Sequence, residues 1–468
     1  MSVFLCTEKQ KRYERHFITY YCSVSDRDIH DLQIMNKLFF IATVGLACIT
    51  SACGDDIDPI ERDWITEEEE VEEIQHNIEI KDESVAFVHP GILHSQEDID
   101  RAKNNVASQT APWIDGWNAL MTNNHFTAPY NGSFQGISVT PNATEKLIRG
   151  GNTIWESEPD NYNNAANQAH AAYHYALAWK ITGDEEYAKA AVNILNAWAT
   201  TCKSLNGDSN VSLAAGLYGY QFANAGELMR DYAGWGADKF AAYQKWMVDV
   251  FYSMNLDYLT RHHDADIMNY WANWDLCNLA SILSIGILAD RRDIYNVAVE
   301  YLLEGEGNGC LKNTIVHVFD GDDAGLAQIQ ESGRDQGHAT LVIGLLGIIA
   351  QTTWNQGDDF FGYNDNVILK AAEYSAKYNV AGLDVPFVEY YNRVHGWHTE
   401  VSADARGTQR PMWEVLYGHY AKVKNVEPKW TQYTLMGVNQ MRPEPGAQTG
   451  DGGGTYDLLG CGTLMYAR

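Results

Sequence analysis

Basic side chains are scarce in this sequence. It has 33 Lys and Arg residues against 62 Asp and Glu, which gives a formal net charge of -29 at pH 7. A protein that binds nucleic acid neutralises phosphates with Lys and Arg, so this balance argues against a nucleic-acid partner. An anionic ligand would need a local basic patch.

The common cofactor motifs are also missing. The sequence contains no P-loop, no G-x-G-x-x-G after an expected strand and no nucleophile elbow. The run HHDAD at 262–266 has the residue types of a metal site. However, the adjacent His262 and His263 would point apart on a helix, so we expect no metal there. We therefore expect no cofactor.

Cysteine is sparse after Cys53, with no C-x-x-C among the four that remain. Four cysteines allow three pairings in an oxidising compartment. Cys277 lies in an apolar stretch, where a buried free thiol is equally compatible. The pairing stays open for Cys202, Cys277, Cys310 and Cys461.

The N-terminal region predicts export. From Met35 the sequence has a short basic start, an apolar run over 38–49 and small residues before Cys53. This pattern is typical of a signal peptide and resembles the lipoprotein type, in which the cysteine is lipidated and becomes the new N-terminus. The apolar run is too short to span a membrane. We expect 1–34 to be an over-extended start, and membrane attachment only through a lipid on Cys53.

An acidic stretch follows over 54–86. So dense a charge block cannot bury a core and predicts a solvated tether. Directly after a lipidated cysteine, it resembles the surface-export signal of Bacteroidetes lipoproteins. We expect an outer-membrane lipoprotein at the cell surface or facing the periplasm. A plain linker is the alternative.

The body of the chain, 87–440, predicts an all-α fold. The clearest helical hairpin spans 161–201 and turns at Thr182, Gly183 and Asp184. Strongly apolar and amphipathic segments alternate, which favours an (α/α) toroid, an incomplete barrel of about six or seven hairpins. A repeat solenoid is the alternative, but no fixed period is present. The Gly-rich end, 441–468, predicts a short irregular tail or cap. Further helices are expected at 212–232, 238–259, 273–289, 294–303, 338–351, 367–378 and 412–423.

Two strongly apolar helices are expected to begin with polar turns. One polar turn spans 328–338 and the other 269–274. A helix that is apolar all round is buried, and its free N-terminal N–H groups favour anions. In a toroid the inner helices run parallel, so both turns should converge on one face. The alternative is two ordinary core helices. The 14 Trp and 27 Tyr suit a carbohydrate cleft or a large aromatic core.

Three motifs carry a resemblance to a known family. They are NYWANWDLCN at 269–278, ESGRDQGH at 331–338 and RGTQRPMWEVLYGHY at 406–420. With them, 88–424 resembles the alginate-lyase-type polysaccharide lyases, which are built on an (α/α) toroid, and is most similar to polysaccharide lyase family 38. This implies β-elimination on a polyuronate such as alginate, polymannuronate or glucuronan, and an acidic polysaccharide as partner.

The resemblance also implies a role for Asn273, and side-chain chemistry suggests roles for Arg334 and His338. Asn273 resembles the asparagine that stabilises charge on the uronate carboxylate, although Asn also suits a helix N-cap. Arg334 can grip a carboxylate, or pair internally with Glu331 or Asp335. His338 is a candidate base or carboxylate-binding group, with a capping core histidine as the alternative. Glu331 more naturally orients Arg334 than reacts.

The proton-transfer residue of such lyases is usually a tyrosine. Tyr390 and Tyr391 come first, because the basic residues around them would lower a phenol pKa. Tyr270 comes second. Two buried or stacking tyrosines are the alternative. The basic residues are Arg393, His395 and His398.

The remaining candidates would bind substrate. Gln336 is a possible donor, and Arg406 and Arg410 would bind neighbouring uronates or form a structural ion-pair network. The aromatic candidates are Tyr270, Trp271 and Trp274.

Two other functions compete with the lyase. A glycoside hydrolase on the same toroid would need two carboxylates across a cleft. A surface glycan-binding lipoprotein would have the same helices and aromatics without catalysis. The sequence leaves open which uronate is cut, endo or exo action, and the oligomeric state. D-mannuronate and D-glucuronate rank first, because their C5 proton and C4 oxygen lie on one side of the ring.

Overall fold

The computed structural model describes residues 74–123, 140–151, 158–447 and 457–468. The expected start at Met35, the signal peptide and the lipidated Cys53 lie outside the described residues. So does the first part of the expected tether.

The packed unit begins at Glu73, earlier than the expected boundary at 87. Lys81 helps to explain the difference. Its Nζ lies 2.8 Å from Asp358 Oδ1, and Asn296 Nδ2 donates to the Lys81 carbonyl oxygen over 2.8 Å. Composition predicted a solvated chain, but ion pairs and backbone hydrogen bonds hold its last part against the helices.

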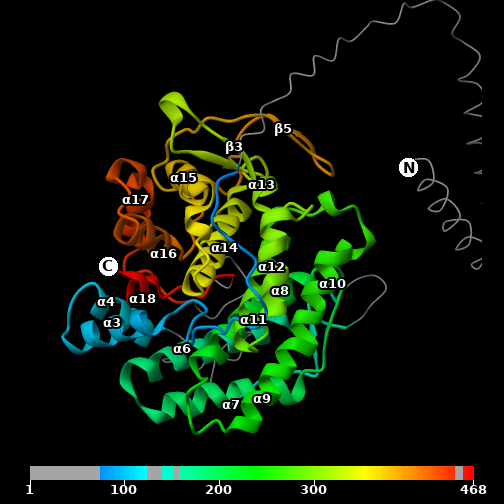
Figure 1. The fold of residues 1–468 in the computed structure, drawn as a ribbon, viewed down its shortest axis with the longest axis vertical. Coiled ribbons are helices and arrows are strands. Elements are labelled where there is room, and N and C mark those ends of the chain that lie inside the picture. Colours follow the sequence, from blue (N-terminus) through cyan, green and yellow to red (C-terminus); the bar gives the residue numbers. More distant parts are fainter. Residues whose placement is uncertain (1–73, 124–139, 152–157, 448–456) are drawn as a thin grey trace, which may run out of the picture. The chain divides into compact units, whose positions relative to one another are not determined.

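The domain is built from helical hairpins, each with a buried inner helix and a more exposed outer one (Figure 1). The inner helices are α6 (Tyr162–Thr182), α8 (Val211–Leu228), α11 (Ala272–Leu288) and α14 (Gln336–Asn355). The outer helices are α7 (Glu185–Thr201), the continuous run of α9 (Ala237–Trp246), π-helical η1 (Met247–Tyr252) and α10 (Ser253–Arg261), then α12 (Arg292–Glu304) and α15 (Tyr363–Asn379).

Shorter elements complete the domain. Before the hairpins come α3 (Gln96–Ala107) and α4 (Trp113–Met121), and after them come α16 (Trp413–Tyr417), π-helical η6 (Gly418–Val423), α17 (Gln432–Met441) and α18 (Gly462–Tyr466). Short connecting helices are α13 (Leu311–Thr314), η2 (His262–Asp264), η3 (Ile267–Asn269), η4 (Gly321–Asp323), η5 (Phe360–Gly362) and η7 (Pro428–Trp430).

Three small sheets of two strands each connect the helices. The parallel pair is β1 (Lys146–Ile148) with β2 (Ser204–Asn206). The antiparallel pairs are β3 (Ile315–Val318) with β4 (Ala327–Ile329), and β5 (Tyr390–Asn392) with β6 (Gly396–His398). No described strand joins a larger sheet, so the fold is the predicted all-α toroid.

The sequence signals at helix ends have the expected geometry. Ser95 and Asp98 form a reciprocal capping box at the start of α3. Gly183 ends α6 with φ of 75°, a conformation that L side chains disfavour. Asp184 then caps α7 by accepting from the Glu186 N–H over 2.9 Å.

The inner helices lie in a row, because α8 packs against both α6 and α11, and α11 packs against α14. Two glycines of α8 allow it to pack closely against α11. A Cβ at Gly216 would lie 2.4 Å from Cys277 Sγ, and one at Gly219 would lie 2.1 Å from Ser281 Oγ. Each inner helix is followed by an outer helix that returns. The N-terminal ends of the inner helices therefore share one face of the domain.

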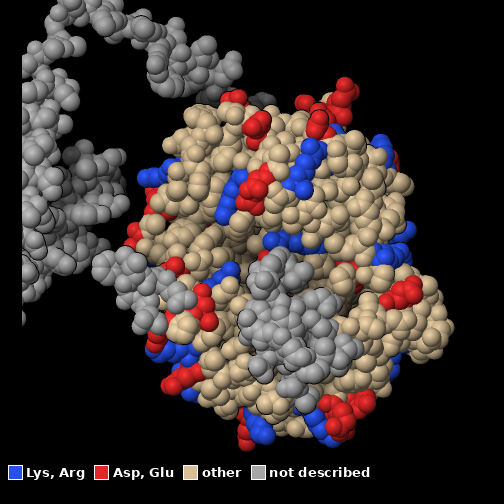
Figure 2. Space-filling model, turned by 180° about the vertical axis from the view of Figure 1, so that it is seen from behind, with Lys and Arg blue, Asp and Glu red and all other residues tan. Residues whose placement is uncertain are grey.

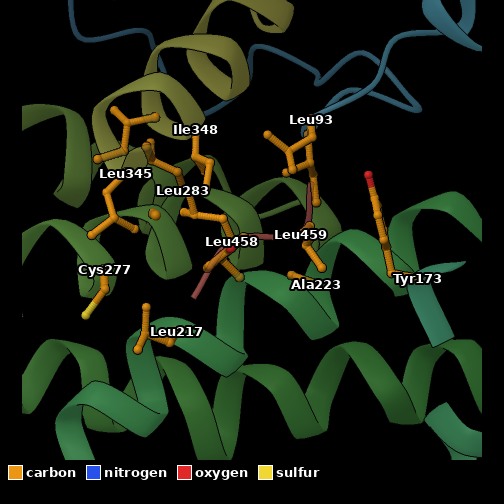
Figure 3. Packing of buried hydrophobic residues seen from close by; sticks show 14 of the residues in the cluster. Leu93, Tyr173, Leu217, Ala223, Cys277, Leu283, Leu345, Ile348, Leu458 and Leu459 are labelled. Atoms are coloured by element: carbon orange, nitrogen blue, oxygen red, sulfur yellow. The ribbon is translucent and has the colours of Figure 1, made fainter. Parts of the chain in front are cut away.

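The core lies between the inner helices and the C-terminal segment. Of the described helices, only α14 is long and apolar enough to span a membrane, and 83% of that window is buried inside the domain. It is the core helix that its apolar run predicted. Figure 3 shows core side chains from these elements, among them Leu217, Ala223, Leu283, Leu345, Ile348, Leu458 and Leu459.

The C-terminal tail is irregular around 442–447 and 457–461, as expected, but ends in the buried helix α18. Tyr466 Oη donates to the Leu93 carbonyl oxygen over 3.0 Å, which joins the two ends of the domain. The four described cysteines are buried and free.

Candidate active site at the N-terminal ends of the inner helices

The first turn of α14 holds a histidine in a defined orientation. Asp335 is the N-cap residue, and its Oδ1 accepts from the His338 N–H over 2.8 Å. The other carboxylate oxygen, Oδ2, lies 2.7 Å from His338 Nδ1. Burial raises the pKa of Asp335, but the hydrogen bonds from His338 and nearby positive charge outweigh it, so the net pKa is lowered. The carboxylate therefore stays ionised and orients the imidazole.

Arg334 completes the surroundings of that imidazole. Its Nη2 lies 3.3 Å from His338 Nε2, so an arginine N–H faces the ring nitrogen that Asp335 does not contact. An acceptor beside Nδ1 and an arginine N–H beside Nε2 suit an imidazole that carries its hydrogen on Nδ1 and accepts at Nε2. The His338 side chain is 40% exposed. Its Nε2 is thus the atom positioned to accept a proton.

Glu331 connects this turn to α11. Its carboxylate is fully buried, and Oε2 lies 3.1 Å from Arg334 Nη1. Its Oε1 accepts from the Asn273 backbone N–H over 2.9 Å. Burial raises the pKa of Glu331, while the charge of Arg334 opposes that rise. Glu331 therefore holds the Asn273 backbone and the Arg334 side chain at one place. We call Glu331, Arg334, Asp335 and His338 the α14 cluster.

Asn273 does not cap α11. The N-cap position belongs to Trp271, and Asn273 is the second helical residue. The Asn273 side chain is buried, and its Oδ1 has no hydrogen-bond partner among the described residues. A buried amide oxygen without a partner is costly, so the alternative role as a cap is not supported.

The aromatic residues before α11 form a wall. The Trp271 ring is 5% exposed, lies 5.1 Å from the His395 ring, and has the Arg334 guanidinium 4.9 Å from its centroid. Tyr270 and Trp274 are partly exposed, with ring centroids 5.0 Å apart. These aromatics therefore lie beside the α14 cluster.

Tyr390 and Tyr391 lie on opposite faces of the β5–β6 hairpin. The Tyr390 hydroxyl donates to the Gln330 carbonyl oxygen and accepts from the Gly333 N–H over 3.1 Å. Burial raises the pKa of Tyr390, so the expected lowering by nearby cations is wrong for this residue. Tyr391 is 59% exposed and contacts Trp397, with 5.6 Å between ring centroids.

Gln336 has structural partners at both ends of its amide. It is 2% exposed, its Nε2 donates to the Ser402 carbonyl oxygen over 3.0 Å, and its Oε1 accepts from Asn379 Nδ2 over 2.9 Å. This geometry disagrees with the expectation that Gln336 donates to substrate, because a buried, fully bonded amide has no free donor to offer.

Arg406 and Arg410 also have partners within the fold. The Arg406 guanidinium lies 3.8 Å from the Tyr378 ring centroid and donates to the Leu383 carbonyl oxygen. Arg410 is 6% exposed and lies 2.5 Å from an Asp457 carboxylate oxygen. These contacts favour the structural network over uronate binding.

Sequence reasoning missed the role of Asp335 towards His338. The signal was present, since a D-x-x-H spacing at a helix start brings the histidine beside the capping carboxylate. Among the described residues, no group of three or more His, Cys, Asp or Glu side chains is arranged to hold a metal ion.

Figure 2 shows Lys and Arg side chains bordering a hollow across the middle of one face of the molecule. Asp and Glu side chains also lie on this face.

Comparison with known proteins agrees with this fold. A solved alginate lyase from Bacteroides ovatus matches 81% of this chain and all of its own chain, with a TM-score of 0.51 and 14% identity. A variant of alginate lyase A1-III from Sphingomonas species A1, complexed with a tetrasaccharide, matches 84% of this chain and 97% of its own, with a TM-score of 0.52 and 13% identity. At such identities the likeness shows the fold alone. No curated protein matches the sequence.

The alginate lyase family model matches residues 96–384, which is more than half of the chain. This range contains Asn273 and the whole α14 cluster. The match favours a lyase over the glycoside hydrolase and the non-catalytic glycan-binding protein. The chain belongs to the alginate lyase family, and it is a polysaccharide lyase.

Proposed function

We propose that this enzyme cleaves a polyuronate, either alginate rich in mannuronate or glucuronan, by β-elimination at the α14 cluster. The observation that carries the proposal is the contact of His338 with Asp335 on one side and Arg334 on the other. Together these neighbours orient an imidazole nitrogen beside a cation that can bind a carboxylate.

The reaction begins with binding of the uronate carboxylate. Arg334 can turn from His338 towards the substrate and form two parallel hydrogen bonds with the carboxylate. Asn273 stands beside it, and a half-turn of its amide would direct Nδ2 to the same group. Both contacts strengthen as negative charge develops on the carboxylate, so they lower the barrier to removing the C5 proton.

His338 Nε2 then takes the C5 proton. The C5–H electron pair forms the C4–C5 double bond, the bond from C4 to the glycosidic oxygen breaks, and that oxygen leaves with its electron pair. Asp335 stabilises the imidazolium that has formed. In the D-uronates the leaving oxygen lies on the same side as the C5 proton, so His338 can return the proton to it.

Tyrosine bases are less well supported. Tyr390 has both its donor and its acceptor contact within the fold, and its pKa is raised. Tyr270 belongs to the aromatic wall before α11, but burial raises its pKa as well. A phenol with a raised pKa is a weak base at neutral pH. This contrast favours His338.

The test is ultraviolet absorbance of the products on polymannuronate, polyguluronate, glucuronan and a neutral glucan. The expected result is absorbance from the conjugated double bond on at least one D-uronate polymer and none on the glucan. Reducing ends without absorbance would indicate hydrolysis and overturn the proposal. Full activity after treatment with EDTA is also expected, since the sequence predicts no cofactor.

We also propose that the mature protein is a lipoprotein of the outer membrane. Its support is the signal-peptide pattern ending at Cys53 and the acidic stretch after it. Mass spectrometry of the membrane fraction should find a lipidated N-terminal peptide that begins at Cys53. Membrane-bound protein that retains 1–34 would contradict this.

A further inference from the structure

One arginine near the candidate active site has no side-chain hydrogen bond or ion pair with the described residues. Arg149 follows β1, and its backbone N–H donates to the Asn206 carbonyl oxygen over 3.1 Å. Its Nη1 is buried and makes no hydrogen bond. Every other described arginine side chain has a hydrogen bond or an ion pair within the described part of the chain. These arginines are Arg101, Arg230, Arg261, Arg291, Arg292, Arg334, Arg393, Arg406, Arg410, Arg442 and Arg468.

The surroundings of Arg149 are aromatic. Its guanidinium lies 4.9 Å from the Tyr162 ring centroid. Tyr162 stacks in turn on Tyr218, with 6.4 Å between centroids and 7° between planes. Asp457 is within electrostatic range, but its carboxylate is already paired with Arg410 over 2.5 Å. The cation therefore has a ring beneath it and no anion bound to it.

Arg149 lies at the same face as the α14 cluster. Tyr162 is the first residue of α6, and the inner helices begin on one face. Cys277, also within electrostatic range of Arg149, lies one turn beyond Asn273 on α11. Arg149 and Arg334 therefore lie along the same face, where the inner helices begin, with the start of α11 between them.

Two amides near this position are also unsatisfied. Asn163 and Asn167 lie on α6 next to Tyr162, four residues apart and so on one helix face. The side-chain oxygen of each is buried without a hydrogen-bond partner, and Asn167 is 4% exposed. An amide oxygen in such a position suits a hydroxyl donor.

We propose that Arg149, Tyr162, Asn163 and Asn167 form a second uronate subsite, which binds the carboxylate and hydroxyls of a sugar next to the one that is cleaved. A buried guanidinium nitrogen without a hydrogen-bond partner is costly, and a carboxylate ligand would supply the missing hydrogen bonds. Tyr162 supplies a flat face beside them. The subsite deepens the proposed function and rests on it, since it needs an acidic polysaccharide.

The test compares three variants of the mature chain. Arg149→Gln removes the charge, Arg149→Lys keeps the charge but not the planar fork, and Arg291→Gln removes an exposed arginine paired with Asp293. Arg149→Gln should raise KM roughly ten- to a hundredfold with kcat almost unchanged, as expected for the loss of a charged hydrogen bond. The rise should be smaller for Arg149→Lys and absent for Arg291→Gln.

Thermal unfolding separates binding from structure. Arg149 has no internal hydrogen bond to lose, so Arg149→Gln should unfold at the same temperature as the parent or a higher one. A lower unfolding temperature with unchanged KM would overturn the subsite. If Arg149→Gln does not fold, Arg149→Lys provides the test. An unchanged KM together with a lowered unfolding temperature for Arg149→Lys would also overturn the subsite.

Calorimetric titration with an oligomannuronate, an oligoglucuronate and a neutral oligosaccharide distinguishes the two proposals. Absence of unsaturated product from the parent on every polyuronate would sink the proposed function, yet the titration would still compare the parent with Arg149→Gln. Equal affinity of the two proteins for the acidic oligosaccharides would sink the subsite alone.

Discussion

Two arginines lie at the same face of the toroid in opposite electrostatic situations. Arg334 has Glu331, Asp335 and His338 within 3.4 Å. Arg149 has the ring of Tyr162, and among the described residues its side chain has no hydrogen bond or ion pair. Internal partners hold Arg334 and His338 in place before substrate arrives. The charge of Arg149 is left for a ligand to satisfy.

The difference predicts which measurement each region should affect. Where partners lie inside the protein, breaking a contact leaves another buried group unsatisfied, so turnover and stability both respond. Where the partner is the ligand, the change should affect binding alone. Four predictions test this contrast, from the largest expected effect to the smallest.

His338→Ala should have the largest effect on turnover. Removing a general base costs roughly a hundred- to ten-thousandfold in kcat. Asp335→Asn is the matched variant, because its side-chain oxygen can still cap α14 while its amide can donate to Nδ1 and favour the wrong tautomer. It should lose less activity than His338→Ala. Steady-state kinetics on the preferred polyuronate measure both, and a kcat within threefold of the parent for His338→Ala would remove the histidine from catalysis.

Asn273→Ala should lower kcat by about a hundredfold, the scale of a lost oxyanion donor. The unfolding temperature should change little, because Asn273 Oδ1 has no partner to lose and the helix cap is elsewhere. Measuring kcat and thermal unfolding on the same preparation checks this. Full activity with a lowered unfolding temperature would show a structural role only.

The two adjacent tyrosines should differ when each is changed to Phe. Tyr390→Phe removes the hydroxyl that joins Gln330 and Gly333, so the turn carrying Arg334 loosens. We expect kcat to fall roughly tenfold and stability to fall by about 1–3 kcal/mol, the cost of a buried group left unsatisfied. Tyr391→Phe should stay within about twofold, because that side chain is mostly exposed. Equal losses from both variants would contradict the two-faced hairpin.

Glu444→Gln should have the smallest effect on turnover. It should change only how the free energy of unfolding depends on pH. Burial and the nearby Glu414 carboxylate raise the pKa of Glu444 from 4.5 to about 8. The folded state therefore holds this proton more tightly than the unfolded chain, and the stability it contributes below pH 4.5 is lost as pH rises towards 8. Glu444→Gln should flatten that decline while kcat is unchanged. Calorimetric unfolding from pH 5 to 9 checks this, and a parent-to-variant difference that is constant with pH would contradict it.

The main features of the fold followed from local patterns. The apolar runs after Trp274 and after His338 predicted α11 and α14, since a helix apolar on every side has to be buried. The polar turns before them gave the N-terminal ends where Asn273 and Arg334 lie. Their meeting followed from the expectation that inner helices of a toroid run parallel, and the structure brings them together through Glu331.

Other assignments depended on contacts that the sequence does not reveal. Tyr390 and Tyr391 have the same local sequence context, and only the alternation of a paired strand directs one inward and the other to solvent. Arg406 and Arg410 look alike in sequence, but carbonyl groups and Asp457 from distant segments satisfy them. Acidic composition predicted a free chain up to 86, whereas Lys81 binds residues almost three hundred positions away.

The sequence by itself determined which segments are buried helices, where these helices begin and which polar residues stand at their starts. Helical periodicity, caps and hydrophobic runs act over a few residues, so they can be recognised without the fold. Only the tertiary structure decided which charges are paired. Arg149, Tyr162, Tyr218 and Asp457 come from four separate segments, and no local pattern links them. Their meeting depends on how the helices pack, and so does the absence of an anion at Arg149.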